Sequence, residues 1–285
     1  MFLAIVRLIA DENELKTRLQ MARTAMVERG IAMAEAETGP SPAVLTLSHG
    51  DAEQLRGALD HMFPDCDWVV THGDIGAPKV FISDMDSTMI GQECIDELAD
   101  YAGIKPQISA ITERAMLGEL DFESALRERV ALLAGLEESA IDRCLEERIR
   151  PNPGARELVE GLKARGTRTV LVTGGFRQFA DRVAETIGFD RVVGNRLAVK
   201  DGKLTGELEG PLTDAGTKAR VLAEEMAGLG EGAVSLALGD GANDIPMIEA
   251  ATCGIAYRAK PRAKAAADGR VESGNLANVL ALLPL

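Results

Sequence analysis

The sequence predicts two domains: a small α+β domain over residues 1–74 and a larger α/β domain over residues 79–285, built on a parallel sheet with a helical cap. A length of 285 residues favours more than one folding unit. Residues 2–70 alternate strand and helix patterns in a βαββαβ order. After the turn formers of residues 72–78, short apolar strands alternate with long helical patterns. Residues 92–148 interrupt that alternation with helical patterns alone, so we expect a cap at about 92–150.

The N-terminal elements follow from hydrophobic spacing and turn residues. Leu15, Leu19, Ala22 and Met26 recur at helical spacing, and Asp51 is placed to cap a second helix. The expected elements are a strand at 2–9, a helix at 12–29, strands near 31–36 and at 43–48, a helix at 51–63 and a strand at 66–70. This order is typical of the ferredoxin-like fold, in which helices cover one face of an antiparallel sheet. It is similar to ACT-type domains, small regulatory domains that bind amino acids.

The larger domain is predicted from strands that each end in polar residues. These strands are VFIS (80–83), TVLV (169–172) and VSLAL (234–238), with helical patterns at 153–165 and 217–227 between them. Such alternation indicates a parallel sheet with right-handed crossovers, whose ligands bind at the carboxyl ends of the strands. We therefore expect the three polar clusters to share one cleft. A hairpin is also predicted at 196–208, because Asp201-Gly202 suits a type I′ turn.

Charge and composition exclude some classes of function. The net charge of -14 disfavours nucleic acid as a partner, although a local cluster of cations can still attract a phosphorylated small molecule. No apolar run is long enough to span a membrane, and the N-terminus lacks a signal-peptide pattern. The four cysteines have no C-x-x-C spacing, which predicts reduced thiols and a cytoplasmic location; they are Cys66, Cys94, Cys144 and Cys253.

Two of the polar clusters are ambiguous in isolation. Asp84 and Asp86 lie in DMDST after the first strand, and a loop with a helix cap is the favoured interpretation of that pair alone. Thr173, in VTGGF, precedes two glycines at the expected start of a helix. A hydroxyl with exposed backbone N–H groups makes an anion site, and a plain glycine-rich turn is equally consistent with the pattern.

Two further elements complete the set. Lys218 lies near the start of the predicted helix at 217–227, where a lone lysine is usually a solvated charge. Asp240 and Asp244 lie in the glycine-rich segment GDGANDIPM, which offers the oxygen ligands that a hard cation prefers. All four elements occur at the strand ends, and in the order, that a single phosphoryl-transfer site requires.

Together these elements closely resemble the haloacid dehalogenase (HAD) superfamily of phosphohydrolases, whose four motifs are D-x-D-x-T, a strand-end Ser or Thr, a Lys and G-D-x-x-x-D. The resemblance covers residues 80–284 and implies a HAD-like Rossmannoid sheet with a helical cap. The segments DMDSTMIGQECIDELA, AMLGELDFESALRERVALLAGL and NRLAVKDGKLTGELEG narrow it to the phosphoserine phosphatase family. Two residues depart from that family: Thr173 stands where serine is common, and Ser83 stands where a hydrophobic residue is usual.

The resemblance implies a role for each motif residue. Asp84 is the nucleophile that forms an aspartyl-phosphate, and Asp86 is the acid and then the base. Mg²⁺ is held by Asp84, the backbone carbonyl of Asp86 and Asp240, with Asp244 and Asn243 in supporting positions. The remaining groups neutralise or hold the phosphoryl group; they are Lys218, Thr173, Gly174 and Gly175.

The resemblance also implies how the substrate is selected. Glu93 pairs with the ammonium of phosphoserine and Arg129 with its carboxylate, while Met116 and Phe122 form an apolar wall. Without the resemblance, Glu93 and Arg129 would be interpreted as solvated helix charges. Arg127, two residues away, would point to a different face of the helix.

The expected activity is hydrolysis of O-phosphoserine to serine and phosphate, the last step of serine biosynthesis. Three alternatives stay open: transfer of the phosphoryl group to another hydroxyl compound, hydrolysis of another small phosphate ester such as a sugar phosphate, and an amino-acid sensor with an inactive phosphatase domain. The N-terminal domain has three candidate roles: to bind serine, to form a homodimer, or to brace the catalytic domain.

Overall fold

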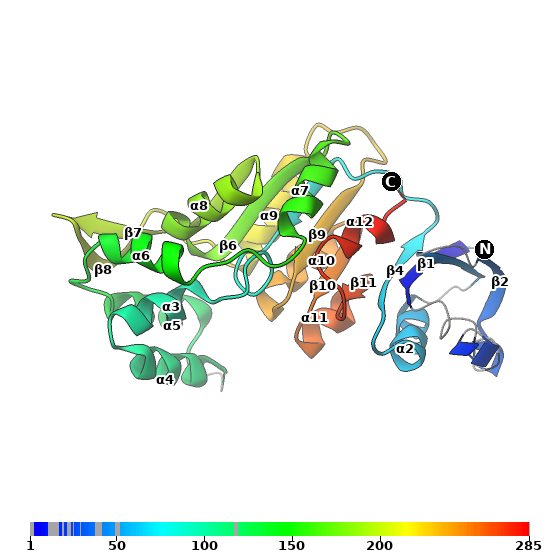
Figure 1. The fold of residues 1–285 in the computed structure, drawn as a ribbon, viewed down its shortest axis with the longest axis horizontal. Helices are drawn as coiled ribbons and strands as arrows, with labels where there is room; N and C mark the ends of the chain where they lie inside the picture. The colour runs from blue at the N-terminus through cyan, green and yellow to red at the C-terminus, as the bar shows by residue number, and fades with distance from the viewer. Residues whose placement is uncertain are drawn as a thin grey trace.

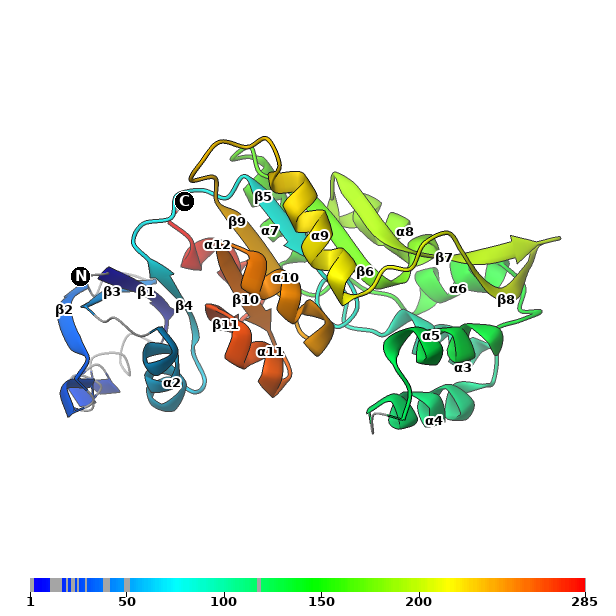
Figure 2. The ribbon, with the colours of Figure 1, turned by 180° about the vertical axis from the view of Figure 1, so that it is seen from behind.

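The fold is organised around one continuous sheet (Figure 1). The computed structural model describes residues 3–10, 17–18, 20–21, 24, 26–28, 30–37, 42–48, 52–116 and 119–284. Within these residues the strand order is β2-β3-β1-β4-β11-β10-β9-β5-β6-β7-β8. Figure 1 shows α7 and α8 in front of the sheet, and Figure 2, the view from behind, shows α9 and α10 on the other face. The larger, C-terminal part is thus a sheet covered by helices on both faces.

The N-terminal part is an antiparallel sheet packed against α2 (Ala52–Met62). Its strands are β1 (Leu3–Ile9), β2 (Ala32–Glu37), β3 (Ala43–Ser48) and β4 (Asp67–His72). They pair in the order β2-β3-β1-β4, which agrees with the ferredoxin-like expectation. The predicted helix at 12–29 lies partly outside the described residues, and its described residues 17–18, 20–21, 24 and 26–28 are all helical. Asp51, the predicted cap, also lies outside them.

The larger part contains a parallel sheet with β5 (Val80–Ser83) near its centre. β5 is fully buried and pairs in parallel with both β6 (Arg168–Phe176) and β9 (Ser235–Gly239). Three parallel strands were not predicted as members of this sheet; they are β7 (Arg191–Lys200), β10 (Cys253–Tyr257) and β11 (Gly269–Val271). The covering helices are α7 (Ala155–Lys163), α8 (Arg177–Ile187), α9 (Ala215–Met226), α10 (Ile245–Ala250), α11 (Pro261–Ala266) and α12 (Asn278–Leu282).

A seam joins the two parts of the sheet. β4 pairs antiparallel with β11, so the N-terminal strands continue the sheet of the larger part instead of forming a separate layer. Side chains reinforce the pairing. The guanidinium of Arg270, in β11, donates to the backbone carbonyls of Phe63 and Pro64, at 2.9 and 3.1 Å, and lies over the Trp68 ring.

The cap is helical, as predicted, and is formed by α3 (Cys94–Tyr101), α4 (Lys105–Met116), α5 (Phe122–Ala131) and α6 (Ser139–Glu147). The two chain segments that connect it to the core run side by side. The Gly91 N–H donates to the Arg150 carbonyl at 3.3 Å, and the Asn152 N–H donates to the Met89 carbonyl at 2.8 Å. This pairing anchors both ends of the cap close to Asp84.

The predicted hairpin is confirmed. β7 turns into β8 (Lys203–Glu209) through Asp201 and Gly202, whose φ angles of 52° and 76° are those of a type I′ turn. Among the described residues, the helices are too short or too polar to cross a membrane.

Candidate active site

A pocket of about 290 Å³ opens where the carboxyl ends of β5, β6 and β9 meet the cap. Parallel strands present their loops at one edge of the sheet, which brings together residues far apart in the chain. Most of the predicted site residues line this pocket; they are Asp84, Asp86, Glu93, Phe122, Arg129, Thr173, Gly174, Gly175, Asp240 and Asn243. Lys218 and Asp244 lie beneath them, almost fully buried. The expected common cleft is therefore present.

The floor of the site is a buried ion-pair network. The Lys218 ammonium lies 2.7 Å from Asp84 Oδ1 and 2.6 Å from Asp244 Oδ1, and its side chain is only 1% exposed. Burial raises the pKa of Asp84 well above its usual value, and the nearby charge of Asp244 adds to this rise, which Lys218 opposes. One buried cation thus faces two buried carboxylates. Removing either the lysine or a carboxylate would leave an uncompensated charge in a buried site, which is strongly destabilising.

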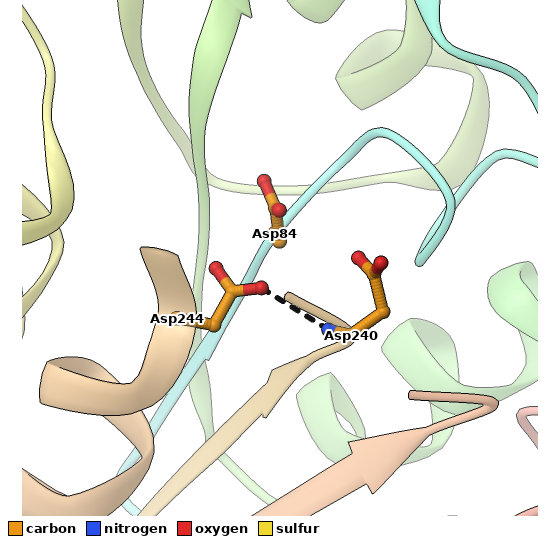
Figure 3. Close-up of side chains that lie close together, drawn as sticks. All are labelled: Asp84, Asp240 and Asp244. Carbon is orange, nitrogen blue, oxygen red and sulfur yellow. Dashed lines mark hydrogen bonds between the residues drawn. The ribbon is translucent and has the colours of Figure 1, made fainter. Parts of the chain in front are cut away.

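Three carboxylates offer a place for a metal ion. Figure 3 shows Asp84, Asp240 and Asp244 facing a common point, and one oxygen from each lies within 4.8 Å of the others. Asp244 already uses both oxygens, one on Lys218 and the other on the N–H groups of Asp240 and Gly241. Asp244 is therefore placed to orient the loop, whereas Asp84 and Asp240 each keep an oxygen that makes no hydrogen bond within the described residues.

The electrostatics of Asp240 also fit a bound cation. Burial, followed by the charge of Asp244, raises the pKa of Asp240 to about 6. Its Oδ1 atom accepts a hydrogen bond from Thr88 Oγ1 at 3.0 Å, which fixes the carboxylate beside Asp84. A cation with oxygen ligands would relieve the repulsion in this cluster. The residues present thus fit a hard metal ion.

Asp86 lies two residues beyond Asp84, and its carboxyl group has different surroundings. Burial, together with the charge of Glu93, raises its pKa to about 7. Its Oδ1 atom accepts the Cys94 N–H, at 3.2 Å, at the start of α3. A carboxyl group with a pKa near neutrality can both give and take a proton at physiological pH.

The segment Thr173–Gly175 differs in part from the expectation. β6 continues to Phe176 and α8 begins only at Arg177, so the two glycines end a strand and do not start a helix. The Gly175 N–H donates to Thr173 Oγ1 at 2.8 Å. A Cβ atom at Gly175 would lie 2.6 Å from Asp86 Oδ2, so the close approach of β6 to the Asp86 side chain requires glycine there.

The cap contributes the remaining wall of the pocket. Arg129 Nε donates to the Ala125 carbonyl at 3.2 Å, which directs the guanidinium along α5. Arg127 pairs instead with Glu123 on the exposed face of that helix, at 2.8 Å, and does not line the pocket. Phe122 lines the pocket and is 41% exposed. Met116 ends α4, and its side chain lies outside the described residues.

A family model of haloacid dehalogenase-like hydrolases matches residues 81–249, the segment that carries all of these motifs, and a second model of that description matches residues 231–282. The chain belongs to the haloacid dehalogenase-like hydrolase family. Its resemblance to that family, inferred from the four motifs, is confirmed.

Individual relatives and solved structures are similar to this hydrolase over most of its length. It is 47% identical to a phosphoserine phosphatase of Idiomarina loihiensis over 72% of this chain and 93% of the relative. It is 45% identical to one from Archaeoglobus fulgidus over 73% of this chain, but spans only 60% of that relative. A HAD family hydrolase of Salmonella enterica matches the whole fold, with a TM-score of 0.82, 27% identity and coverage of 100% of this chain and 99% of the other.

A structure described as a phospho-aspartyl intermediate analogue of phosphoserine phosphatase also matches this hydrolase. Its TM-score is 0.66, with 39% identity over 73% of this chain and 99% of the other.

Sequence reasoning missed several residues that shape the hydrolase site. Lys260 lines the pocket, and its N–H donates to the Asp240 carbonyl at 2.9 Å. It follows β10, so the same strand-end rule would have found it had CGIAY been assigned as a strand. Thr88 is the threonine of D-x-D-x-T and Asn195 begins the segment NRLAVKDGKLTGELEG, but the sequence analysis assigned neither residue a role. In the structure Thr88 Oγ1 donates to Asp240, and Asn195 Nδ2 donates to the Gly174 carbonyl.

Proposed function

We propose that the protein hydrolyses O-phosphoserine to serine and inorganic phosphate through an aspartyl-phosphate on Asp84, and so completes serine biosynthesis. One observation carries this proposal. A single pocket is lined by Asp84, which pairs with the buried Lys218 beneath it as phosphoryl transfer requires, and by Glu93 and Arg129 from the cap, which suit an amino acid. The names of the relatives point to the same substrate.

In the proposed reaction Asp84 attacks phosphorus while the bond from phosphorus to the seryl oxygen breaks. The charge on the transferring group is balanced by the Lys218 ammonium, by the Thr173 hydroxyl and by the Gly174 N–H. Asp86 gives its proton to the departing seryl oxygen. It then takes a proton from the water that cleaves the aspartyl-phosphate, which releases phosphate and restores Asp84.

We propose Mg²⁺ as the cofactor. Asp84, Asp240 and the backbone carbonyl of Asp86 would hold it, with Asp244 and Asn243 supporting the loop. Bound there, it would neutralise charge on the phosphoryl oxygens. The support for this assignment is a cluster that carries more carboxylate than cation and is all oxygen in its donor atoms.

Substrate choice is assigned to the cap. Glu93 would bind the ammonium of phosphoserine and Arg129 its carboxylate, because a guanidinium can hold a carboxylate through two hydrogen bonds. Phe122 would exclude water from the reacting phosphate. Burial lowers the pKa of Arg129, and the carboxylates of Asp96 and Glu93 oppose this effect. Because no salt bridge to Arg129 is formed within the described residues, its guanidinium is available for a substrate carboxylate.

The test is a panel of phosphomonoesters assayed with Mg²⁺, with Arg129→Ala compared against Arg127→Ala as a matched control. We expect phosphoserine to be the best substrate. Arg129→Ala should lower its kcat/KM by about 100-fold, while Arg127→Ala stays near wild type. A sugar phosphate that outperforms phosphoserine would refute the substrate assignment. Loss of free phosphate on addition of an alcohol, with a new ester formed, would identify a phosphotransferase instead.

For the N-terminal domain we propose a bracing role, because its sheet is continuous with the catalytic sheet. If the domain instead binds serine as an ACT-type domain does, serine should change the activity. If it forms a homodimer, light scattering should give twice the chain mass. We propose a cytoplasmic location on the basis of cysteines that lack pairwise spacing.

A further inference from the structure

The tip of the β7–β8 hairpin is hydrogen-bonded to the cap. The Gly135 N–H donates to the Leu204 carbonyl and the Leu204 N–H donates to the Leu136 carbonyl, both at 2.8 Å. The Glu138 N–H reaches the Gly202 carbonyl at the same distance. These bonds join β8 to the segment that directly follows α5. The cap is therefore attached to the core at this hairpin as well as through its two connecting segments.

Gly206 brings the hairpin against α5 itself. Its φ angle is +84°, and a Cβ atom there would lie 2.9 Å from Ala134 Cβ and 3.1 Å from the Ala131 carbonyl oxygen. Ala131 is the last residue of α5, two residues beyond Arg129. Because no side chain fits between the strand and the helix, the position of β8 fixes the position of this end of α5.

The same hairpin is tied to the phosphate-binding segment at its other end. Asn195, in β7, is 1% exposed and donates through Nδ2 to the Gly174 carbonyl at 2.8 Å. It pairs in the sheet with Phe176, directly after the glycines of that segment. A second clamp follows at Leu197, whose N–H and carbonyl both bond to the Gln178 side chain, at 3.2 and 2.8 Å.

We propose that the β7–β8 hairpin is a specificity-determining element that sets the spacing between the phosphate-binding segment Thr173–Gly175 and Arg129. In this inference, which rests on the proposed function, Gly206 is a positioning residue and does not touch the substrate. The hairpin holds one end of the pocket through Asn195 and the other through α5. It thereby selects esters whose carboxylate lies at the distance found in phosphoserine.

The chain offers a matched pair of glycines to test this. Gly206 and Gly210 have φ angles of +84° and +82°, so alanine is equally strained at both, but a Cβ atom at Gly210 meets nothing within 4 Å. The assay compares phosphoserine with phosphoethanolamine, which keeps the phosphate and ammonium and lacks the carboxylate. We expect Gly206→Ala to raise KM for phosphoserine by about 10-fold with little change in kcat, and Gly210→Ala to stay within about 2-fold.

With phosphoethanolamine, both variants should behave like wild type, because no carboxylate has to reach Arg129. Equal effects of Gly206→Ala and Gly210→Ala on phosphoserine would overturn the inference. So would a loss by Gly206→Ala that is the same for both substrates. The wild type is assayed first with both substrates. If it does not prefer phosphoserine to phosphoethanolamine, the proposed function fails independently of the two variants.

A second perturbation avoids any packing defect. Lys203 Nζ lies 3.0 Å from Glu137 Oε1 across the hairpin–cap contact, with both side chains more than half exposed. Lys203→Glu places like charges together, and the exchange Lys203→Glu with Glu137→Lys restores attraction. We expect the single change to raise KM for phosphoserine by about 3-fold and the exchange to restore it. An exchange that does not restore KM, or a single change without effect, counts against the hairpin.

Discussion

Replacing Asp67 with asparagine should weaken the seam between the N-terminal strands and the catalytic sheet. Asp67 is 1% exposed and ends the antiparallel pairing of β4. Its Oδ1 atom accepts from the N–H groups of Glu272 and Ser273, at 2.8 and 3.0 Å, and from Ser273 Oγ at 3.2 Å. Its Oδ2 atom accepts from the Gly274 N–H at 3.0 Å and from Asn278 Nδ2 at 2.7 Å.

The expected cost follows from these bonds. Asparagine keeps one oxygen, so the Glu272 and Ser273 contacts can survive, but its amide nitrogen would face the donors of Gly274 and Asn278. We expect the free energy of unfolding to fall by about 3 kcal/mol, because two hydrogen bonds are lost, two donors are left unsatisfied and a buried charge is removed. For a chain of this size that lowers the melting temperature by roughly 6 °C.

Urea unfolding, followed by circular dichroism and by Trp68 fluorescence, measures this effect. Trp68 is the only tryptophan in the chain and lies at the seam. Asp65→Asn is the matched control, since Asp65 is exposed and the change of charge is the same. The two probes should give one coincident transition for the wild type. A loss below about 1 kcal/mol, or equal losses in the two variants, would refute the view that Asp67 holds the two parts together.

Three further predictions concern the active site. Burial raises the pKa of Asp240 from 3.8 to about 6, so the folded protein keeps this proton to higher pH than the unfolded chain does, and stability falls as pH rises through that range. Mg²⁺ should therefore raise the melting temperature more at about pH 7.5 than at about pH 5. An equal shift at both pH values would contradict the assigned site. Lys260→Gln should lower kcat/KM for phosphoserine by about 3- to 10-fold at low salt and weaken the dependence of kcat/KM on ionic strength. Lys264→Gln is the control and should do neither, because Lys264 pairs with Glu272 at 2.8 Å. Identical salt profiles for the two variants would exclude a role for Lys260 in attracting the substrate. Thr173→Ser should keep activity within about 3-fold of wild type, whereas Thr173→Val should lose about 100-fold in kcat. A valine variant as active as the serine variant would show that the hydroxyl has no part in the mechanism.

The arrangement of the site was largely predictable because it depends on short-range patterns. Asp84 and Asp240 each follow an apolar strand, and Thr173 lies near the end of another, so the topology of a parallel sheet places them together. The hairpin turn was predictable for the same reason, since Asp201 and Gly202 encode their own backbone conformation. Arg129 and Glu93 needed the family resemblance, because nothing in the local pattern separates them from solvated helix charges.

The features that were missed depend on contacts between distant parts of the chain. β11 is three residues long and has no periodicity to detect, yet its pairing with β4 merges the two sheets. Thr88 and Asp240 both lie in recognised motifs, but they are 152 positions apart, so neither local sequence predicts the hydrogen bond between them. The glycines after Thr173 were expected to start a helix. Sheet pairing of Phe176 with Asn195 keeps that segment extended instead.

The most direct test of the account is whether Asp84 carries the phosphoryl group. Enzyme mixed with phosphoserine and Mg²⁺ is quenched in acid within one turnover, digested and examined by mass spectrometry, with Asp84→Asn in parallel. We predict a phosphoryl group on the peptide that contains Asp84, and, for Asp84→Asn, neither this adduct nor release of phosphate above the uncatalysed rate. A fully active Asp84→Asn variant, or a phosphoryl group on another residue, would contradict the account.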